Sequence, residues 1–311
     1  MSCSSTSPDA RPAWFLAAVK DRGQTCHLDV RGARVAYRAW GLRGAPVLVL
    51  VHGGAAHAGW WDHVAPILAA GRRVVALDLT GHGSSDKRSR YDFLSWADEI
   101  EAVGAAEADG GRFFVAGHSM GSVAALAAAY RHREQVAGTI AVDPPDWLVA
   151  EGGLDARRTV LPPRRFYPTR DLAAARFQAR PVDRARQWFV ERHVAERSVH
   201  STADGWTWRF DLAVTRHDTF PADLWGGEIG PVVLVRAERG LLSAEQAADL
   251  SGLLGGVVQL VIRDSGHHVM LDQPVALIAC LRDVLARWPS SARGNDRRRN
   301  VPETPRGYFY V

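Results

Sequence analysis

Short apolar runs recur along the chain and are typical of strands buried on both faces of a sheet. These runs, rich in valine, leucine and alanine, cover residues 46–51, 73–79, 113–116, 137–142, 231–235 and 257–262. Longer stretches with helical character lie between or after them, at residues 62–70, 91–108, 122–132, 245–254 and 275–288. Strands that alternate with helices predict an α/β fold, with a mostly parallel sheet flanked by helices.

The two ends of the chain differ from this pattern. Residues 25–40 alternate polar and apolar side chains on both sides of Gly32, which predicts a two-stranded hairpin. Residues 1–24 are expected to form a disordered or loosely attached arm, with one or two helical turns at 13–20. Residues 289–311 are polar and rich in arginine, so we expect a disordered basic tail.

The segment 144–230 interrupts the series of buried strands. Its charged residues alternate with aromatic side chains in helical spacing, namely Trp188, Phe189, Trp206, Trp208 and Phe210. An insertion of this kind between two strands predicts a helical lid whose apolar face covers a cleft. The α/β core would then comprise residues 25–143 and 231–288.

Composition excludes several classes of protein. The 311 residues carry a formal net charge of +4, but no basic stripe with interleaved aromatic residues predicts a nucleic-acid partner. Cys3, Cys26 and Cys280 are too few and too scattered for a disulfide framework or a metal site. No secretory signal or membrane-spanning run is found, so we expect a soluble cytoplasmic protein, monomer or homodimer, without a cofactor.

A serine between two glycines follows the apolar run at 113–116. Gly117, Ser119 and Gly121 form a G-x-S-x-G sequence, and an alanine-rich helical segment comes directly after it. This is the nucleophile elbow, in which a tight turn between strand and helix exposes the serine hydroxyl. Glycine at both flanking positions lets neighbouring backbone pass close by. The sequence therefore predicts Ser119 as a nucleophile.

A second glycine-rich turn follows the strand at 46–51. It begins at His52 and Gly53, at the end of a parallel strand where ligands commonly bind. We assign the N–H groups of Gly54 and Met120 to an oxyanion hole. Trp60 and Trp61 come next, and we expect one to line a pocket and the other to fill the core. Trp60 and Trp147 are the predicted substrate-binding residues.

Near the end of the core, His267 follows Gly266 after the last strand. The order serine, acid, histidine and the turn segments 52–53, 78–86, 117–121 and 266–274 make residues 25–288 resemble the α/β-hydrolase superfamily. Within it, the chain looks like the lid-bearing subgroup of serine esterases, lactonases, carbon–carbon bond hydrolases and MenH-like enzymes. The resemblance implies that His267, rather than its neighbour His268, is the catalytic base.

The resemblance leaves two candidates for the acid of the triad. Most relatives carry it after the strand equivalent to 231–235, but Gly240 stands about where that aspartate is expected. Asp143 follows the preceding strand directly, whereas Glu238 lies beside two arginines that offer it a surface ion pair. We favour Asp143, with Glu238 as the alternative. Asp78 and His82 are expected to hold a turn rather than to act in catalysis.

These residues predict a serine hydrolase that cleaves a carboxylic ester or lactone through an acyl-enzyme. A serine at the elbow argues against epoxide hydrolases and haloalkane dehalogenases, which use an aspartate there. The aromatic residues of the lid suggest an apolar or aromatic small-molecule substrate. The alternatives are carbon–carbon bond hydrolysis or a MenH-like lyase step, and a non-catalytic ligand-binding protein on the same scaffold, which the missing acid at Gly240 would allow.

Overall fold

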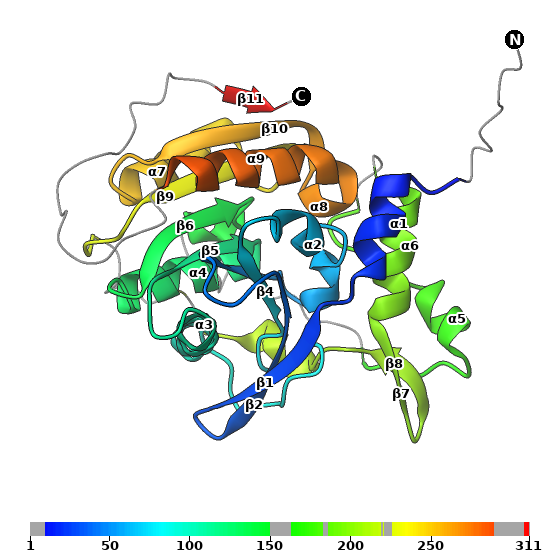
Figure 1. The fold of residues 1–311 in the computed structure, drawn as a ribbon. Helices are drawn as coiled ribbons and strands as arrows, with labels where there is room; N and C mark the ends of the chain where they lie inside the picture. Colours follow the sequence, from blue (N-terminus) through cyan, green and yellow to red (C-terminus); the bar gives the residue numbers. More distant parts are fainter. Residues whose placement is uncertain are drawn as a thin grey trace, which may run out of the picture.

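The computed structural model describes residues 10–149, 163–182, 186–218, 220 and 226–288, together with the backbone of 308–310. Within these residues, nine strands form one sheet in the order β1-β2-β4-β3-β5-β6-β9-β10-β11 (Figure 1). The first pairs, β1 with β2 and β2 with β4, are antiparallel, and all later pairs are parallel. The strands are β1 (Gln24–Val30), β2 (Ala33–Trp40), β3 (Val47–Val51), β4 (Arg73–Leu77), β5 (Phe113–His118), β6 (Val136–Val142), β9 (Val232–Arg239), β10 (Val258–Gly266) and β11 (Tyr308–Tyr310).

Helices cover both faces of the sheet, which confirms the predicted α/β-hydrolase architecture (Figure 1). Strand β3 illustrates why: all five of its residues are buried, and alternate side chains point to opposite faces. Val47, Val49 and Val51 pack in the same cluster as α3 (Phe93–Glu107), α4 (Met120–Arg131) and α7 (Ala244–Leu253). Leu48 and Leu50 pack in the opposite cluster with α2 (Ala65–Leu68), α8 (Val269–Asp272) and α9 (Pro274–Arg287).

The N-terminal helix is part of the packed structure. Helix α1 (Ala13–Lys20) buries Phe15 completely, and the Phe15 ring lies 4.8 Å from that of Phe189 in α6 (Trp188–Arg197). The expectation of a loosely attached arm is therefore wrong for residues 13–20, because Phe15 anchors this helix. Residues 1–9 lie outside the described part of the chain.

The segment predicted as a helical lid contains a β-hairpin. Its described elements include α5 (Arg170–Ala174), α6, the strands β7 (Val199–Thr202) and β8 (Gly205–Trp208), and the short helices η2 (Asp146–Leu148) and η4 (Leu212–Arg216). The prediction of a helix is confirmed for Trp188 and Phe189, which lie on α6. It is wrong for Trp206 and Trp208, which lie on β8. Gly205, with a φ of +118°, allows the tight turn that brings β7 and β8 together. Residues 150–162, 183–185, 219 and 221–225 of this segment are outside the described residues.

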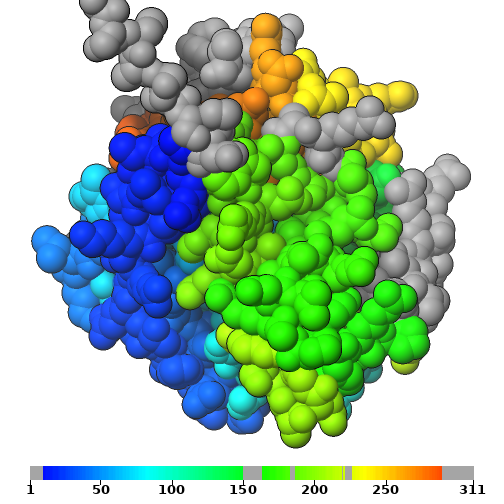
Figure 2. All heavy atoms as spheres, turned by 90° about the vertical axis from the view of Figure 1, so that its right-hand side faces the viewer, coloured from blue at the N-terminus to red at the C-terminus, as the bar shows by residue number. Residues whose placement is uncertain are grey.

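Figure 2 shows the inserted segment from the side on which it lies, as a green surface next to the blue N-terminal part of the chain. One contact between them is the Phe15–Phe189 ring pair of α1 and α6. The insertion therefore packs against the N-terminal part of the chain as well as against the core.

The C-terminal segment adds a strand. The backbone of Tyr308–Tyr310 forms β11, parallel to β10, with Leu260 opposite Tyr308. The prediction of a disordered tail is thus wrong for these residues, since the outer edge of β10 offers them hydrogen-bond partners. The rest of the predicted tail is not among the described residues. No helix in the described part of the chain is both long and apolar enough to cross a bilayer.

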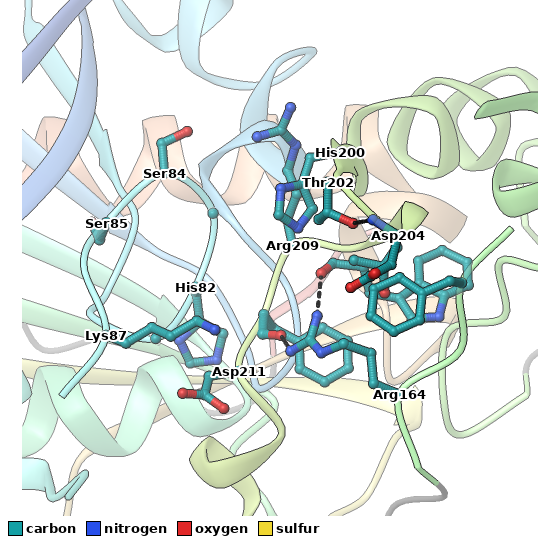
Figure 3. Close-up of a pocket in the computed structure, with 16 residues that line it drawn as sticks. His82, Ser84, Ser85, Lys87, Arg164, His200, Thr202, Asp204, Arg209 and Asp211 are labelled. Atoms are coloured by element: carbon teal, nitrogen blue, oxygen red, sulfur yellow. Dashed lines mark hydrogen bonds between the residues drawn. The ribbon is translucent and has the colours of Figure 1, made fainter. Parts of the chain in front are cut away.

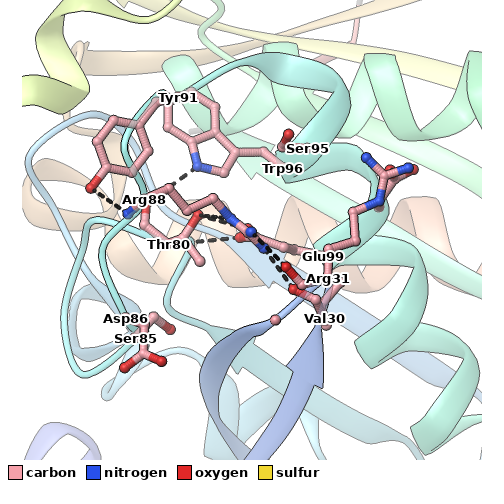
Figure 4. A network of polar contacts seen from close by, with 12 residues as sticks. Val30, Arg31, Thr80, Ser85, Asp86, Arg88, Tyr91, Ser95, Trp96 and Glu99 are labelled. Atoms are coloured by element: carbon pink, nitrogen blue, oxygen red, sulfur yellow. Dashed lines mark hydrogen bonds and ion pairs between the residues drawn. The ribbon is translucent and has the colours of Figure 1, made fainter.

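Polar contacts fix the turn that follows β4 (Figure 4). The fully buried carboxylate of Glu99 accepts hydrogen bonds from the N–H and the hydroxyl of Thr80, at 2.9 and 2.6 Å. It also forms an ion pair with Arg88 at 3.1 Å. Arg88 also donates to the carbonyl of Val30 at 2.7 Å. These contacts join β1, the turn and α3.

Candidate active site

The serine of the elbow has the backbone conformation that the motif requires. Ser119 has φ +53° and ψ −126°, a region that glycine adopts readily and other residues rarely. A Cβ on Gly117 would lie 2.1 Å from the carbonyl oxygen of Gly121, and a Cβ on Gly121 would lie 2.2 Å from that of His52. Backbone from β3, β5 and α4 thus meets around the serine, which explains both glycines.

Three side chains from distant parts of the sequence form a hydrogen-bonded series. Ser119 Oγ lies 3.0 Å from His267 Nε2, and His267 Nδ1 lies 2.7 Å from Asp143 Oδ2. His267 and Asp143 are buried, whereas Ser119 is partly exposed. The carboxylate fixes the imidazole with its proton on Nδ1, so Nε2 can accept the proton of the serine hydroxyl.

Asp143 is held at the end of β6. Its Oδ1 accepts the N–H of Ala237 and its Oδ2 the N–H of Leu241, both at 3.0 Å. The alternative acid Glu238 is 44% exposed, accepts the N–H of Asp264 at 2.8 Å and pairs with Arg239. The structure therefore brings Asp143 to His267 and leaves Glu238 at the surface.

The other sequence-predicted residues take different places. Gly54 and Met120 are adjacent, since a Cβ on Gly54 would lie 3.6 Å from the Met120 sulfur. Trp60 is 6% exposed and its ring lies 5.4 Å from that of His268, whereas Trp61 is completely buried in the core. Trp147 packs against Phe93 and His217, and no contact links it to the Ser119–His267–Asp143 series.

Asp78 and His82 hold the turn after β4, as expected. Asp78 Oδ1 accepts the N–H of Ala58 at 2.6 Å, and Oδ2 accepts that of Ser84 at 2.8 Å. The ring of His82 contacts the Thr80 carbonyl through Nδ1 at 3.3 Å. Asp78 thereby joins the glycine-rich turn after β3 to the turn after β4.

A cavity of about 360 Å³ lies between this second turn and the lid hairpin (Figure 3). Its lining includes His82 and Lys87 on one side and Arg164, His200 and Arg209 on the other. None of the three residues of the Ser119–His267–Asp143 series lines it. The cavity is therefore a separate feature of the interface between core and insertion.

Sequence reasoning missed the role of His118. This residue occupies the variable position before the serine, and its Nε2–H donates to the backbone carbonyl of His267 at 2.8 Å. The bond ties the elbow to the loop that carries the histidine. Residue 118 stands beside the serine in sequence, but its partner lies 149 residues further on, so sequence alone gave no signal for the contact.

Comparisons with known proteins agree with this architecture. A profile of the alpha/beta hydrolase family matches residues 48–279. Esterase Rv0045c of Mycobacterium tuberculosis is 30% identical over 82% of this chain and 88% of that protein. A solved structure of that esterase, from a study of its inhibition by transition metals, is 28% identical, with a TM-score of 0.68 over 85% of this chain and 92% of that one.

A further solved structure shares the fold. The crystal structure of E-2-(acetamidomethylene)succinate hydrolase has a TM-score of 0.74 at 21% identity, over 85% of this chain and 99% of that one. The family match spans well over half of the sequence and includes Ser119, Asp143 and His267. The chain therefore belongs to the alpha/beta hydrolase family.

Proposed function

We propose that this protein is a serine hydrolase that cleaves a carboxylic ester or lactone through an acyl-enzyme on Ser119. The observation that carries the proposal is the series Ser119 Oγ, His267 Nε2 and Nδ1, and Asp143 Oδ2, at 3.0 and 2.7 Å. The 30% identity to an esterase over most of both chains supports the same bond type.

The reaction follows from the positions of these groups. Ser119 Oγ attacks the carbonyl carbon while its proton passes to His267 Nε2, and Asp143 stabilises the imidazolium that forms. The negative charge on the carbonyl oxygen is stabilised by the N–H groups of Gly54 and Met120. His267 then protonates the leaving alcohol, and a water molecule, deprotonated by His267, releases the acid and regenerates the serine.

Aromatic rings lie next to the loop that carries His267 and His268. Trp60 lies beside His268, and Phe177 from the inserted segment lies 6.0 Å from Trp60. Apolar rings contributed by both the core and the insertion favour an apolar or aromatic acyl group. For Trp147 a role in substrate binding stays a prediction without a supporting contact.

The deciding experiment is labelling with a fluorophosphonate, followed by intact mass, together with hydrolysis of 4-nitrophenyl acetate. Wild type should gain one adduct, and Ser119→Ala none. Asp143→Asn should slow labelling by about 10⁴-fold, the cost of losing the acid of a triad. Glu238→Gln is the matched control, because it also neutralises a carboxylate, near the end of the neighbouring strand β9, and it should react like wild type.

A folded wild-type protein without an adduct would refute the proposal and favour a ligand-binding protein on this scaffold. The only sequence feature that favoured such a protein was the missing acid at position 240, and the Asp143–His267 contact removes that reason. Labelling of Ser119 without ester turnover, but with cleavage of a vinylogous diketone, would favour carbon–carbon bond hydrolysis instead.

A further inference from the structure

Three histidines converge beside the nucleophile. His118, His267 and His268 each place a ring nitrogen within 4.8 Å of the other two, and all three side chains are buried. They come from two separate segments, the end of β5 and the loop after β10. The proposed mechanism uses only His267, and it leaves Nδ1 of His118 and both ring nitrogens of His268 without a hydrogen-bond partner among the described residues.

His118 has the environment of a histidine prepared to bind a metal. Its Nε2–H donates to the carbonyl of His267, which leaves a lone pair on Nδ1, and this buried atom has no hydrogen-bond partner among the described residues. A Cβ on Gly53 would lie 3.1 Å from this Nδ1 and 3.2 Å from Ser119 Cβ, so the free lone pair borders the same space as the serine. Metal-bound histidines commonly donate their other N–H to a carbonyl or carboxylate in this way.

His267 meets the same condition. Its Nδ1–H donates to the Asp143 carboxylate, and its Nε2 lone pair faces Ser119. A carboxylate behind an imidazole makes the opposite nitrogen a better metal ligand, as in carboxylate–histidine–zinc groups. The feature that prepares His267 to accept a proton thus also prepares it to bind a cation.

His268 supplies the third imidazole. It is 5% exposed, and neither of its ring nitrogens makes a hydrogen bond within the described residues. The carbonyl of Arg180 faces the ring without a bond of normal geometry. Burial, reinforced by the charges of His267 and Arg186, lowers the pKa of His268 to about 2. Two unpaired buried nitrogens are costly, and a ligand that satisfies one of them would be stabilised.

We propose that His118, His267 and His268 form a binding site for a divalent transition metal ion of the zinc class. Imidazole nitrogen suits Zn²⁺, Cu²⁺ and Ni²⁺, whereas Mg²⁺ requires oxygen ligands, and this set contains none from a carboxylate. A tetrahedral zinc with bonds of about 2.0–2.1 Å holds its nitrogens about 3.3 Å apart. The three rings must therefore close together, and His268, which has no hydrogen bond to break, is the ring that moves.

Occupancy of this site has a direct consequence for the reaction proposed above. A metal on His267 Nε2 takes the lone pair that would accept the proton of Ser119, so the hydroxyl is no longer activated. The metal is therefore a reversible inhibitor rather than a cofactor. This consequence rests on the proposed function, whereas metal binding itself does not.

Binding is tested by titrating Zn²⁺ into the Ser119→Ala protein and measuring the heat released. We expect one Zn²⁺ per chain, bound at least as tightly as by wild type, because Nε2 no longer shares its lone pair with a hydroxyl. His268→Gln and His118→Gln, made in the same background, should each weaken binding by about tenfold or more. His200→Gln removes a histidine from the lid hairpin and should leave the affinity unchanged.

Equal Zn²⁺ affinity in the His268→Gln and His200→Gln proteins would overturn the site, as would binding of Mg²⁺ with similar affinity. The second readout is hydrolysis of 4-nitrophenyl acetate by the wild-type serine protein. Zn²⁺ should inhibit, EDTA should restore activity, and His268→Gln should raise the half-inhibitory concentration by about tenfold or more. Zinc binding without any ester turnover would refute the proposed function and leave the metal site standing.

Discussion

The carboxylate of Asp143 fills the space in which a side chain at position 240 would begin. A Cβ on Gly240 would lie 2.1 Å from Oδ1 and 2.4 Å from Oδ2 of Asp143. Asp143 directly follows β6, and Gly240 directly follows β9, the strand next to β6 in the sheet. Position 240 is also where the resemblance to relatives places the acid. A carboxylate could therefore reach the same point from position 143 or from position 240, but the space holds only one of them at a time.

Gly240→Ala should therefore impair the proposed reaction, although it replaces none of Ser119, His267 and Asp143. The new methyl group displaces the Asp143 carboxylate from His267 and from the N–H groups of Ala237 and Leu241. We expect kcat/KM for 4-nitrophenyl acetate to fall by about 10²-fold or more. The fall should approach the effect of removing the acid altogether. Gly252→Ala is the control, since a Cβ there meets nothing within 4 Å. Normal turnover by the Gly240→Ala enzyme would contradict the expected clash.

Moving the acid to the neighbouring strand should restore activity. Asp143→Ala alone is expected to lower kcat by about 10⁴-fold. Adding Gly240→Asp to this variant puts a carboxylate back into the vacated space, and kcat should recover by at least about tenfold. The measurement is kcat for the two variants, with circular dichroism to verify folding. A folded double variant no faster than Asp143→Ala would mean that the backbone at position 240 cannot aim a carboxylate at His267.

Asp62 in the core contacts two arginines and a histidine, and two of these three residues belong to the inserted segment. Arg38 forms an ion pair with its Oδ1, while His193 and Arg197 of α6 contact its Oδ2 at 2.9 and 3.2 Å. Burial alone would raise the pKa of the Asp62 carboxyl, but the hydrogen bond from His193 and the charges of Arg38 and Arg197 outweigh it and lower the pKa. Asp62→Asn leaves Arg38 and Arg197 without a counter-charge and should cost about 3 kcal/mol of unfolding free energy at pH 7.

The effect of Asp62 should depend on pH in a defined direction. The unfolded carboxyl titrates near pH 4 and the folded one lower, so its stabilisation is complete above about pH 4 and is lost as the pH falls below that value. Urea unfolding of wild type and Asp62→Asn should therefore differ most at neutral pH, and the difference should narrow in acid. A gap that stays constant from pH 7 to pH 3 would show that the charge of Asp62 is not what stabilises the fold.

Phe15 anchors the N-terminal helix to the insertion. Its completely buried ring packs on Phe189 and lies 5.8 Å from His193. Phe15→Ala should lower the free energy of unfolding by about 3–5 kcal/mol, through lost burial and the cavity left behind. Leu16→Ala changes the next residue, which is 43% exposed, and should cost less than about 1 kcal/mol. Urea unfolding of both variants gives the comparison, and similar losses would mean that α1 is only loosely packed.

Sequence patterns predicted most of the core because its signals are local. The buried strand β3 and the elbow around Ser119 can each be identified from a few consecutive residues. The order of serine, acid and histidine along the chain then indicated the fold family. Asp143 was favoured over Glu238 because it follows its strand directly, and that rigidity is what the Ala237 and Leu241 hydrogen bonds provide.

Features that depend on contacts between distant segments could not be predicted in this way. Trp206 and Trp208 are an exception, because a spacing of two residues is the period of a strand and the helical prediction overlooked this local signal; both lie on β8, which pairs with β7. Phe15 is one of several apolar residues at positions 13–19, and nothing in the sequence marks it as the one that packs on Phe189. The three histidines of the proposed metal site belong to segments about 150 residues apart, so no ligand spacing marks them in the sequence.

The φ angle of +53° at Ser119 lowers the stability of the fold at the position of the proposed nucleophile. Every residue with a Cβ is strained in this conformation, including the serine itself, and glycine alone adopts it freely. Ser119→Gly should therefore unfold at a higher temperature than both wild type and Ser119→Ala, by the equivalent of about 1 kcal/mol, although it has no nucleophile. Under the proposed function, this strain is the cost of holding a nucleophilic hydroxyl in the turn between β5 and α4.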